Sequence, residues 1–273
     1  MNKNFSVSLS VYKNDNPKNF EEAFLSIINQ TLVPSEIVLV VDGPIPIKTR
    51  KIISDFKLNY KFLKVIELKQ NQGHGNARKV GLNNCTNEIV ALMDSDDISV
   101  NNRFELQLTF LTDNPGISVV GGQIEEFVHD VKNIVSKRKV PLTDKKIKKY
   151  LKSRCPFNQM TVMFYKNKVN EAGGYKDWFC NEDYYLWIRM YMNNNRFGNL
   201  DETLVKVRID DNMFLRRAGW KYFKSEFGIQ KLLLTNNIIS NLRFCYNIFI
   251  RIIVQLLIPN GIRKFIFIKL FRT

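Results

Sequence analysis

Residues 89–97 read Ile89-Val90-Ala91-Leu92-Met93-Asp94-Ser95-Asp96-Asp97. Five apolar residues in a row are typical of a strand that is buried on both faces of a parallel sheet. The aspartates follow at once, so we expect them at the carboxyl end of that strand, where open α/β sheets bind their ligands. Asp94 and Asp96 point to the same side if the backbone stays extended, because side chains alternate along a strand.

Two carboxylates this close repel each other unless a cation neutralises them. Their hard oxygens suit Mg²⁺ or Mn²⁺, which would keep positions open for phosphate oxygens. A calcium EF-hand is excluded because Ile98 and Ser99 occupy loop positions five and six, where an oxygen ligand and a glycine are needed. An ordinary acidic turn is the alternative, and the four-residue motif alone does not decide between the two.

The chain around this motif alternates apolar runs with helical patterns. The expected strands are Phe5–Val11, Glu36–Val41, Phe62–Leu68, Glu88–Met93, Ile117–Gly121 and Gln159–Tyr165. The expected helices are Pro17–Asn29, Ile47–Leu58, Gly75–Asn84, Asn102–Thr112, Lys145–Ser153 and Glu182–Asn193, with Asn16 as one cap and a capping box at Asn102 and Glu105. Strand–helix–strand repetition predicts an α/β fold with a mostly parallel, doubly wound sheet.

Composition narrows the class of protein. The chain has 273 residues, with 41 Lys and Arg against 26 Asp and Glu, for a formal net charge of +15. Its hydrophobic content of 45% excludes a disordered tail, and four widely spaced cysteines exclude a zinc ribbon or disulfide scaffold. The first residues lack the apolar core of a signal peptide, so we expect reduced thiols and a cytoplasmic protein.

The C-terminal region is both basic and apolar. Between Asn241 and Ile258, polar residues recur every fourth position, at Arg243, Asn247, Arg251 and Gln255. On a helix these form one narrow stripe. A membrane-spanning helix is disfavoured because Arg251 would lie mid-bilayer. A helix packed on the domain and a helix lying in the membrane interface both fit, and the basic tail favours the interface.

Three further motifs could carry chemistry. Asp42 ends the second strand at the same sheet edge and could bind a base or ribose, although Asp-Gly is also a common turn. The stretch 71–78 is a glycine-rich approach to a helix in which Arg78 could pair with phosphate, and it is not a dinucleotide fingerprint. Glu182 and Asp183 open a helix rich in aromatic residues, which suits a sugar site with a general base but also ordinary helix-terminal acids.

Together these motifs resemble the GT-A-fold glycosyltransferases of family 2, in particular the amylovoran, O-antigen and capsule subgroup. The resemblance spans residues 5–220. It rests on Ser8-Leu9-Ser10-Val11-Tyr12, Asp42-Gly43, Gly73 to Arg78, Asp94-Ser95-Asp96-Asp97, Gly173-Gly174-Tyr175 and the stretch from Glu182 to Met190. One departure is Gln159, where relatives often carry histidine.

The resemblance implies an inverting, metal-dependent enzyme that moves a hexose, galactose or N-acetylhexosamine, from a UDP-sugar. Asp183 would be the catalytic base. Asp96 and Asp94 would bind Mn²⁺ or Mg²⁺. The implied nucleotide-sugar site is Ser10, Val11, Tyr12, Asp42, Gly73, Arg78, Asp94, Ser95 and Asp96, and the implied acceptor or donor sugar site is Glu182, Trp178, Trp187, Arg189 and Gln159. Residues 1–120 would bind the nucleotide-sugar and 121–220 the acceptor, with 221–273 an amphipathic, membrane-proximal helical region.

The expected acceptor is a glycan or a lipid-diphosphate-linked sugar in cell-surface polysaccharide synthesis. Residues 241–273 would hold the enzyme on the inner face of the cell membrane. A sugar nucleotidyltransferase is the alternative enzyme class, disfavoured because no glycine follows the first strand before Pro17. A basic membrane or nucleic-acid binder is the non-enzyme alternative, and we expect no nucleic-acid partner because no reader motif appears. A glycoside hydrolase is rejected because the paired acids sit among phosphate-type partners.

Overall fold

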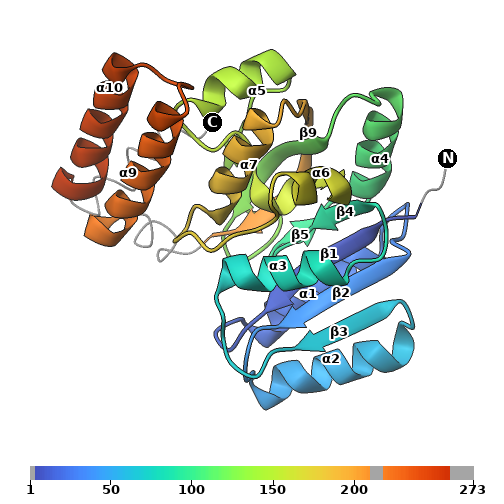
Figure 1. The fold of residues 1–273 in the computed structure, drawn as a ribbon. Helices are drawn as coiled ribbons and strands as arrows, with labels where there is room; N and C mark the ends of the chain where they lie inside the picture. The colour runs from blue at the N-terminus through green and yellow to red at the C-terminus, as the bar shows by residue number, and fades with distance from the viewer. Residues whose placement is uncertain (1–3, 210–217, 259–273) are drawn as a thin grey trace.

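The computed structural model describes residues 4–209 and 218–258. One mixed sheet runs through the molecule in the order β3-β2-β1-β4-β8-β6-β9-β5, with β7 paired to β6 (Figure 1). Its strands are β1 (Ser6–Val11), β2 (Glu36–Val41), β3 (Leu63–Glu67), β4 (Ile89–Leu92), β5 (Ile98–Ser99), β6 (Val119–Phe127), β7 (Ile134–Arg138), β8 (Met163–Tyr165) and β9 (Phe197–Arg208). The predicted α/β fold class is confirmed.

Helices cover both faces of this sheet (Figure 1). They are α1 (Pro17–Ile28), α2 (Ile47–Asn59), α3 (His74–Asn84), α4 (Arg103–Asp113), α5 (Asp144–Leu151), α6 (Lys166–Glu171), α7 (Glu182–Met192), α9 (Gly219–Thr235) and α10 (Asn241–Arg251). Helices α1, α2 and α4 share one hydrophobic core, and α3, α5, α6, α7 and α9 share the other. Within β4, Ala91 belongs to the first core and its neighbours Val90 and Leu92 to the second, which is why the strand reads as an uninterrupted apolar run.

The predicted parallel half is confirmed. Strands β1, β2, β3 and β4 pair in parallel, so their carboxyl ends meet at one edge. The predicted cap of α1 also forms, since the Asn16 side chain accepts from the backbone of Lys18 and Asn19. Beyond β4 the sheet becomes mixed, because β8 is antiparallel to both β4 and β6.

Two local predictions are wrong. The Asn102 side chain does not cap α4, and the Glu105 carboxylate accepts instead from the Thr31 hydroxyl. Residues 159–161 form a short 3-10 helix, so β8 begins only at Met163. The tertiary contact of Glu105 replaces the local bond that the capping box requires.

Helix α10 packs with its polar stripe inward. Asn247 is buried and donates to Gln230 of α9 and to the Lys152 carbonyl oxygen, and Gln255 on the π-helical turn η2 (Ile252–Leu257) is also buried. Arg251 pairs with Glu226 of α9 at 2.6 Å. Three of the four stripe residues therefore serve packing, and the expected contact of the stripe with lipid is wrong for them. No helix within the described ranges combines the length and apolar content needed to cross a bilayer.

The outer face of α10 is apolar. Leu242, Tyr246 and Phe249 are 85%, 58% and 60% exposed, and their spacing places them on one side of the helix. Leu257, the last residue of η2, is also exposed. The helical pair α9–α10 lies at the end of the molecule away from β3, so this face is not covered by the sheet domain (Figure 1).

The Arg251–Glu226 ion pair gives a stability prediction. Both side chains are about nine-tenths buried, so Arg251→Ala leaves the Glu226 charge without its partner. We expect Arg251→Ala to lower the free energy of unfolding by about 3 kcal/mol. Urea unfolding measures the change. The double variant Arg251→Met with Glu226→Gln should recover most of it, and an equal loss in the double variant would contradict the ion-pair explanation.

Candidate active site

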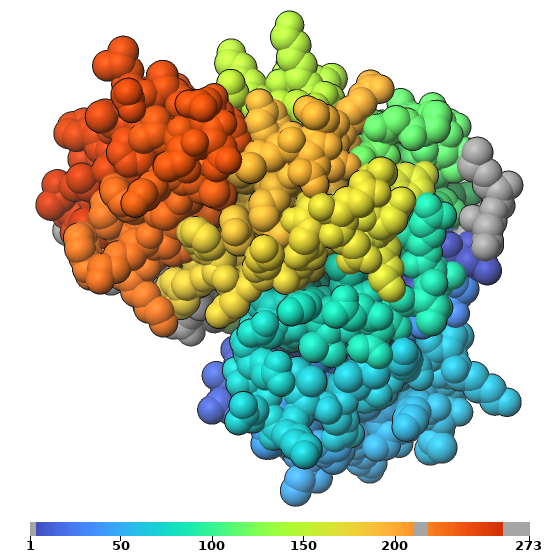
Figure 2. Space-filling model, viewed as in Figure 1, coloured from blue at the N-terminus to red at the C-terminus, as the bar shows by residue number. Residues whose placement is uncertain are grey.

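The predicted site residues gather where the carboxyl ends of β1, β2 and β4 meet the start of α7. Helix α3 approaches α7 closely enough that a Cβ placed on Gly75 would lie 3.3 Å from the Glu182 Cβ. Figure 2 shows the yellow segment that precedes α7 lying directly against the teal surface of α3. The acids at the sheet edge and the acids that open α7 thus belong to one region.

Asp42 is buried at the end of β2 and organises the loop before α3. Its Oδ1 accepts from the Gln72 backbone at 2.7 Å, and its Oδ2 accepts from the Asn71 side chain at 2.9 Å and the Gly73 backbone at 3.1 Å. Gly73 has φ +86°, a left-handed conformation that favours glycine. Asp42 therefore shapes the predicted nucleotide loop, and its contact with uridine stays a prediction.

Arg78 is buried and orients Asp94. One guanidinium nitrogen donates to the carbonyl oxygens of Ser8 and Met93, at 3.2 and 3.0 Å, and another donates to Asp94 Oδ1. The guanidinium thus joins β1, β4 and the acidic turn. These partners of the Arg78 guanidinium all belong to the protein, so its predicted contact with phosphate stays a prediction, and what the structure shows is that it orients Asp94.

The acidic turn places its carboxylates in different environments. Asp94 is a quarter exposed and Asp96 is exposed, whereas Asp97 is buried and accepts from the Arg208 backbone at 2.9 Å. Burial, followed by the charges of Asp96 and Asp94, raises the pKa of Asp97 well above its usual range. Asp97 is therefore structural, and the predicted Asp94–Asp96 pair is the part of the turn that a ligand can reach.

Ser95 and Tyr12 are joined by Asp15, a residue that sequence analysis missed. One Asp15 oxygen accepts from the Ser95 hydroxyl at 2.8 Å and from the Tyr12 backbone at 3.0 Å. Burial raises the pKa of Asp15. The contact fixes the loop after β1, where Ser10 and Val11 end the strand, against the turn after β4.

His74 connects the two halves of the site. Its Nδ1 lies 2.6 Å from Glu182 Oε1, and its Nε2 lies 3.2 Å from Arg78 Nε and 3.9 Å from Asp94 Oδ1. Burial favours the neutral form of Glu182, but the bond and charge of His74 outweigh burial and lower the Glu182 pKa. Glu182 is therefore ionised, and the His74 side chain connects it to Asp94 of the acidic turn.

Asp183 is partly exposed and lies beside Glu182 at the first turn of α7. Its Oδ1 accepts from the Tyr184 backbone at 2.6 Å, and its Oδ2 accepts from the Cys155 thiol at 3.4 Å. Burial, and then the negative charge of Glu182, raise the pKa of Asp183 to about 6. A carboxylate with this pKa is a stronger base than an ordinary aspartate and is still ionised at neutral pH.

Of the other amino acids predicted to contact a sugar, some lie at the site and others only support the fold. Gln159 lies near the site and donates to the Tyr175 hydroxyl at 2.9 Å. Trp187 is fully buried against Phe157 and Phe164, so the predicted sugar contact is wrong for this side chain, which has no face open to a ligand.

Trp178 and Arg189, which were also predicted to contact a sugar, hold neighbouring segments in place. The Trp178 ring packs at a tilt against Tyr185, and its indole N–H donates to the Ser225 carbonyl oxygen, so it attaches α9. Arg189 donates to the carbonyl oxygens of Ala172 and Gly174 and fixes the turn before Tyr175. Both act on the site through the segments that they hold in place.

The acidic turn suits a divalent metal ion chemically. Asp94 and Asp96 offer hard carboxylate oxygens that solvent reaches, at the edge where β4 ends. Within the described ranges, no three His, Cys, Asp or Glu side chains converge as a metal site. A divalent ion bound at this turn would have two acidic side chains as ligands and would keep positions open for oxygens of a substrate.

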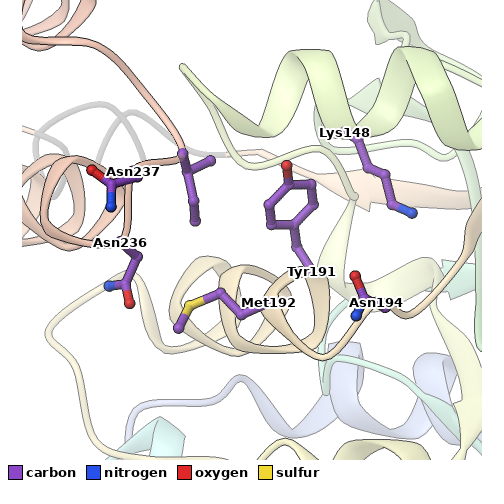
Figure 3. A pocket seen from close by; sticks show the side chains of 7 residues that line it. Lys148, Tyr191, Met192, Asn194, Asn236 and Asn237 are labelled. Atoms are coloured by element: carbon purple, nitrogen blue, oxygen red, sulfur yellow. The ribbon is translucent and has the colours of Figure 1, made fainter.

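The cavity drawn in Figure 3 lies elsewhere. It has a volume of about 390 Å³ and is lined by Lys148, Tyr191, Met192, Asn194, Asn236, Asn237 and Ile238. It borders the carboxyl end of α7, about 15 Å along the helix from Glu182 at 1.5 Å per residue. Its lining holds no acid that could serve as a base, so we assign it no part in the chemistry.

Sequence reasoning missed His74, Asp15 and Cys155. His74 has no second histidine nearby and so gives no sign of a metal site, yet its position between Gly73 and Gly75, at the start of α3, places it at the sheet edge. Asp15 follows β1 at the same edge. It could have been found because ligands of open α/β sheets bind at the carboxyl ends of the strands. Cys155 has no local signal, because its contact with Asp183 crosses 28 residues.

The fold is a mixed sheet with acids at the carboxyl ends of its parallel strands and further acids at the start of α7. This combination is typical of GT-A-fold glycosyltransferases. Residues 6–174 match the model of glycosyl transferase family 2, and the chain belongs to this family, which inverts configuration at the transferred sugar. The predicted family resemblance is confirmed.

Similar proteins agree with this placement. The amylovoran biosynthesis glycosyltransferase AmsE of Erwinia amylovora is 35% identical over 265 residues, covering 97% of this chain and 98% of AmsE. UDP-Gal:alpha-D-GlcNAc-diphosphoundecaprenol beta-1,3-galactosyltransferase of Escherichia coli is 35% identical over 268 residues, covering 98% of this chain and 96% of that enzyme.

Two solved structures share the fold. S. aureus TarS 1–349 in complex with UDP-GlcNAc has a TM-score of 0.64 at 19% identity, covering 89% of this chain and 69% of that one. Mannosyltransferase PcManGT from Pyrobaculum calidifontis, in complex with GDP-Man and Mn²⁺, has a TM-score of 0.61 at 16% identity, covering 82% of this chain and 63% of that one.

Proposed function

We propose that this enzyme transfers a hexose, galactose or N-acetylhexosamine, from a UDP-sugar to a lipid-diphosphate-linked sugar during synthesis of a cell-surface polysaccharide. The names of two relatives support the substrate classes, since one is an amylovoran enzyme and the other uses UDP-Gal and a diphosphoundecaprenol acceptor. The proposed location is the cytoplasmic face of the cell membrane, where such an acceptor is reached.

One observation carries the proposal. His74 links Glu182 to the acidic turn, at 2.6 Å from the first and 3.9 Å from Asp94, and Asp183 follows Glu182 on the same helical turn. The acids proposed to hold the diphosphate and the helical turn that carries the proposed base are thus joined through one histidine. This supports a single displacement, because the leaving group and the nucleophile must both reach the anomeric carbon of one bound sugar.

The proposed chemistry follows from the charge states. Asp183 accepts the proton of the acceptor hydroxyl as its oxygen attacks the anomeric carbon. Glu182 stays negative beside it and binds sugar hydroxyls. A divalent ion held by Asp94 and Asp96 would neutralise charge on the departing diphosphate. An α-linked nucleotide sugar then gives a β-linked product.

The nucleotide is proposed to lie along the carboxyl ends of β1 and β2. Ser10, Val11, Tyr12 and Asp42 surround the uridine, with the backbone loop that ends at Gly73 next to the phosphates. Support comes from the hydrogen bonds that connect this loop to Asp42 and the β1 loop to Ser95. Backbone N–H groups at the start of α3 favour bound anions.

A nucleotide-sugar panel tests the proposal. The full chain is incubated with UDP-, GDP- and dTDP-sugars, Mn²⁺ and a lipid-diphosphate-linked sugar, and UDP and glycolipid are measured. We expect release of UDP with formation of a β-linked product. Release of pyrophosphate instead of UDP would favour a nucleotidyltransferase, and an α-linked product would rule out the inverting geometry.

Membrane association is proposed through the outer face of α10 together with the basic tail. The tail, residues 259–273, lies outside the described residues, but α10 exposes Leu242, Tyr246 and Phe249 on one side. Burial of such a face in an interface is favourable by about 25 cal/mol per Å². Asn247 and Arg251 of the polar stripe are engaged with α9, so the exposed apolar side is the one available to lipid.

Liposome co-sedimentation checks this surface. We expect Leu242→Glu with Phe249→Glu to remove most binding to vesicles containing anionic lipid, because two charges would enter the apolar layer. The matched control is Ile47→Glu with Leu58→Glu, two residues of α2 that are 87% and 81% exposed. Equal loss in both double variants, or none in the first, would contradict the proposed surface.

A further inference from the structure

Asp183 has a second partner that the proposed mechanism does not use. The Cys155 thiol comes from the segment between α5 and the 3-10 helix and lies 3.4 Å from Asp183 Oδ2. Cys155 is a free thiol that is only partly exposed. We propose that Cys155 is a positioning residue, whose S–H donates to Asp183 Oδ2 and directs the remaining lone pair toward the acceptor hydroxyl. The inference rests on the proposed role of Asp183 as base.

The segment that carries the thiol is held from a third element. Arg138, the last residue of β7, donates to the carbonyl oxygen of Cys155 at 3.2 Å and to that of Phe157 at 3.5 Å. The Phe157 ring packs against Trp187 of α7, with ring centroids 5.1 Å apart. Cys155 is therefore fixed relative to α7 from both sides, so the thiol is preorganised against the carboxylate.

The thiol remains a donor over the working pH range. Burial, and then the negative charge of Asp183, raise the pKa of the Cys155 thiol well above its usual range. A second acceptor, the Phe157 carbonyl oxygen, lies 3.6 Å from the sulfur. The carboxylate is nearer and charged, so it is the better acceptor for the single thiol proton.

A weak donor suits a general base better than a strong one. An S–H bond stabilises a carboxylate less than an O–H bond does, so it orients the oxygen while taking little basicity from it. A hydroxyl in the same place would lower the pKa of Asp183, and removal of the donor would raise it. Because a base is more effective when its pKa is near the operating pH, the thiol combines orientation with basicity.

The other charged groups around Asp183 stay constant in this comparison. Glu182 raises the pKa of Asp183, whereas Arg138 and the Tyr184 backbone N–H lower it. The buried Tyr175 hydroxyl also responds to the charge of Asp183. None of these groups changes when Cys155 alone is replaced, so a shifted titration of Asp183 reports the Cys155 contact.

The test compares kcat against pH for the full-length parent, Cys155→Ser and Cys155→Ala, with saturating donor and acceptor. We expect the acidic limb to move to lower pH in Cys155→Ser and to higher pH in Cys155→Ala, each by about half a pH unit. The KM for the donor should not change. Limbs that coincide in all three proteins, or that move in one direction in both variants, would overturn the proposal.

Two controls keep the result interpretable. Cys85→Ser replaces another buried thiol, at the carboxyl end of α3 beyond Asn84, and should leave the acidic limb in place. If Cys155→Ala does not fold, the nearly isosteric Cys155→Ser decides alone through the direction of its shift. Activity retained in Asp183→Asn would defeat the proposed base itself, whereas an inactive Asp183→Asn with unmoved limbs in the Cys155 variants would defeat only this inference.

Discussion

Asp183→Asn is expected to reduce sugar transfer about a thousandfold while leaving UDP binding unchanged. The amide cannot take the acceptor proton, although its oxygen can still accept from the Tyr184 backbone and keep the first turn of α7 intact. Transfer is measured as glycolipid formed per unit time, and UDP affinity by calorimetry. Asp177→Asn, an exposed acid in the preceding segment, is the matched control and should retain full activity.

The pH dependence of the parent enzyme should agree with this role. Asp183 works as a base only when ionised, so kcat should rise with pH through about 6, the pKa of its carboxyl group. Turnover that is level between pH 5 and pH 7 would contradict the assignment, as would full turnover by the Asp183→Asn variant.

The contribution of Asp183 to folding stability should fall with rising pH, whereas kcat should rise. The fold raises the Asp183 pKa from 3.8 to about 6, so it favours the protonated form. This contribution to stability is complete below the pKa of the unfolded chain and is lost as pH rises through the folded value. Asp183→Asn removes that loss, so the variant should be at least as stable as the parent at neutral pH, where the parent keeps a costly charge for catalysis.

The parallel half of the fold could be predicted because its strands are short apolar runs. Glu36–Val41 was predicted with its observed bounds, and the strands on either side differ by a residue or two. β9 was missed because its centre is exposed and polar, at Asp201 and Glu202, so no continuous apolar run marks the strand. Where burial is uneven along a strand, its hydrophobic pattern is weak.

The site could be predicted as far as the acids at strand and helix ends. Those positions follow from topology alone, because parallel strands present their carboxyl ends together. The contacts between segments could not be predicted: His74 meets Glu182 across 108 residues. The predicted sugar contact of Trp187 on α7 was wrong for a related reason. That helix is buried on several sides, and its sequence does not distinguish a face in the core from a face toward a ligand.

Asp96→Ala is expected to remove the effect of Mn²⁺ on UDP binding. Asp96 is the exposed carboxylate of the acidic turn, whereas Asp94 is already engaged by Arg78. Loss of one acidic ligand should lower UDP affinity in the presence of Mn²⁺ by about tenfold or more, to the value that the parent shows with EDTA. Calorimetric titrations of UDP with and without Mn²⁺ give both values, and equal affinity of the parent under the two conditions would contradict a metal role.

Asp97→Asn separates the metal role from the structural role of the same turn. Burial and the two neighbouring charges raise the pKa of Asp97, so an amide resembles its favoured neutral form. The amide oxygen can still accept from the Arg208 backbone, as the carboxylate does at 2.9 Å. Asp97→Asn should therefore keep both the fold and the Mn²⁺-dependent binding of UDP. If it loses metal dependence as fully as Asp96→Ala does, the turn acts through its shape, and the assignment of Asp96 as the metal ligand fails.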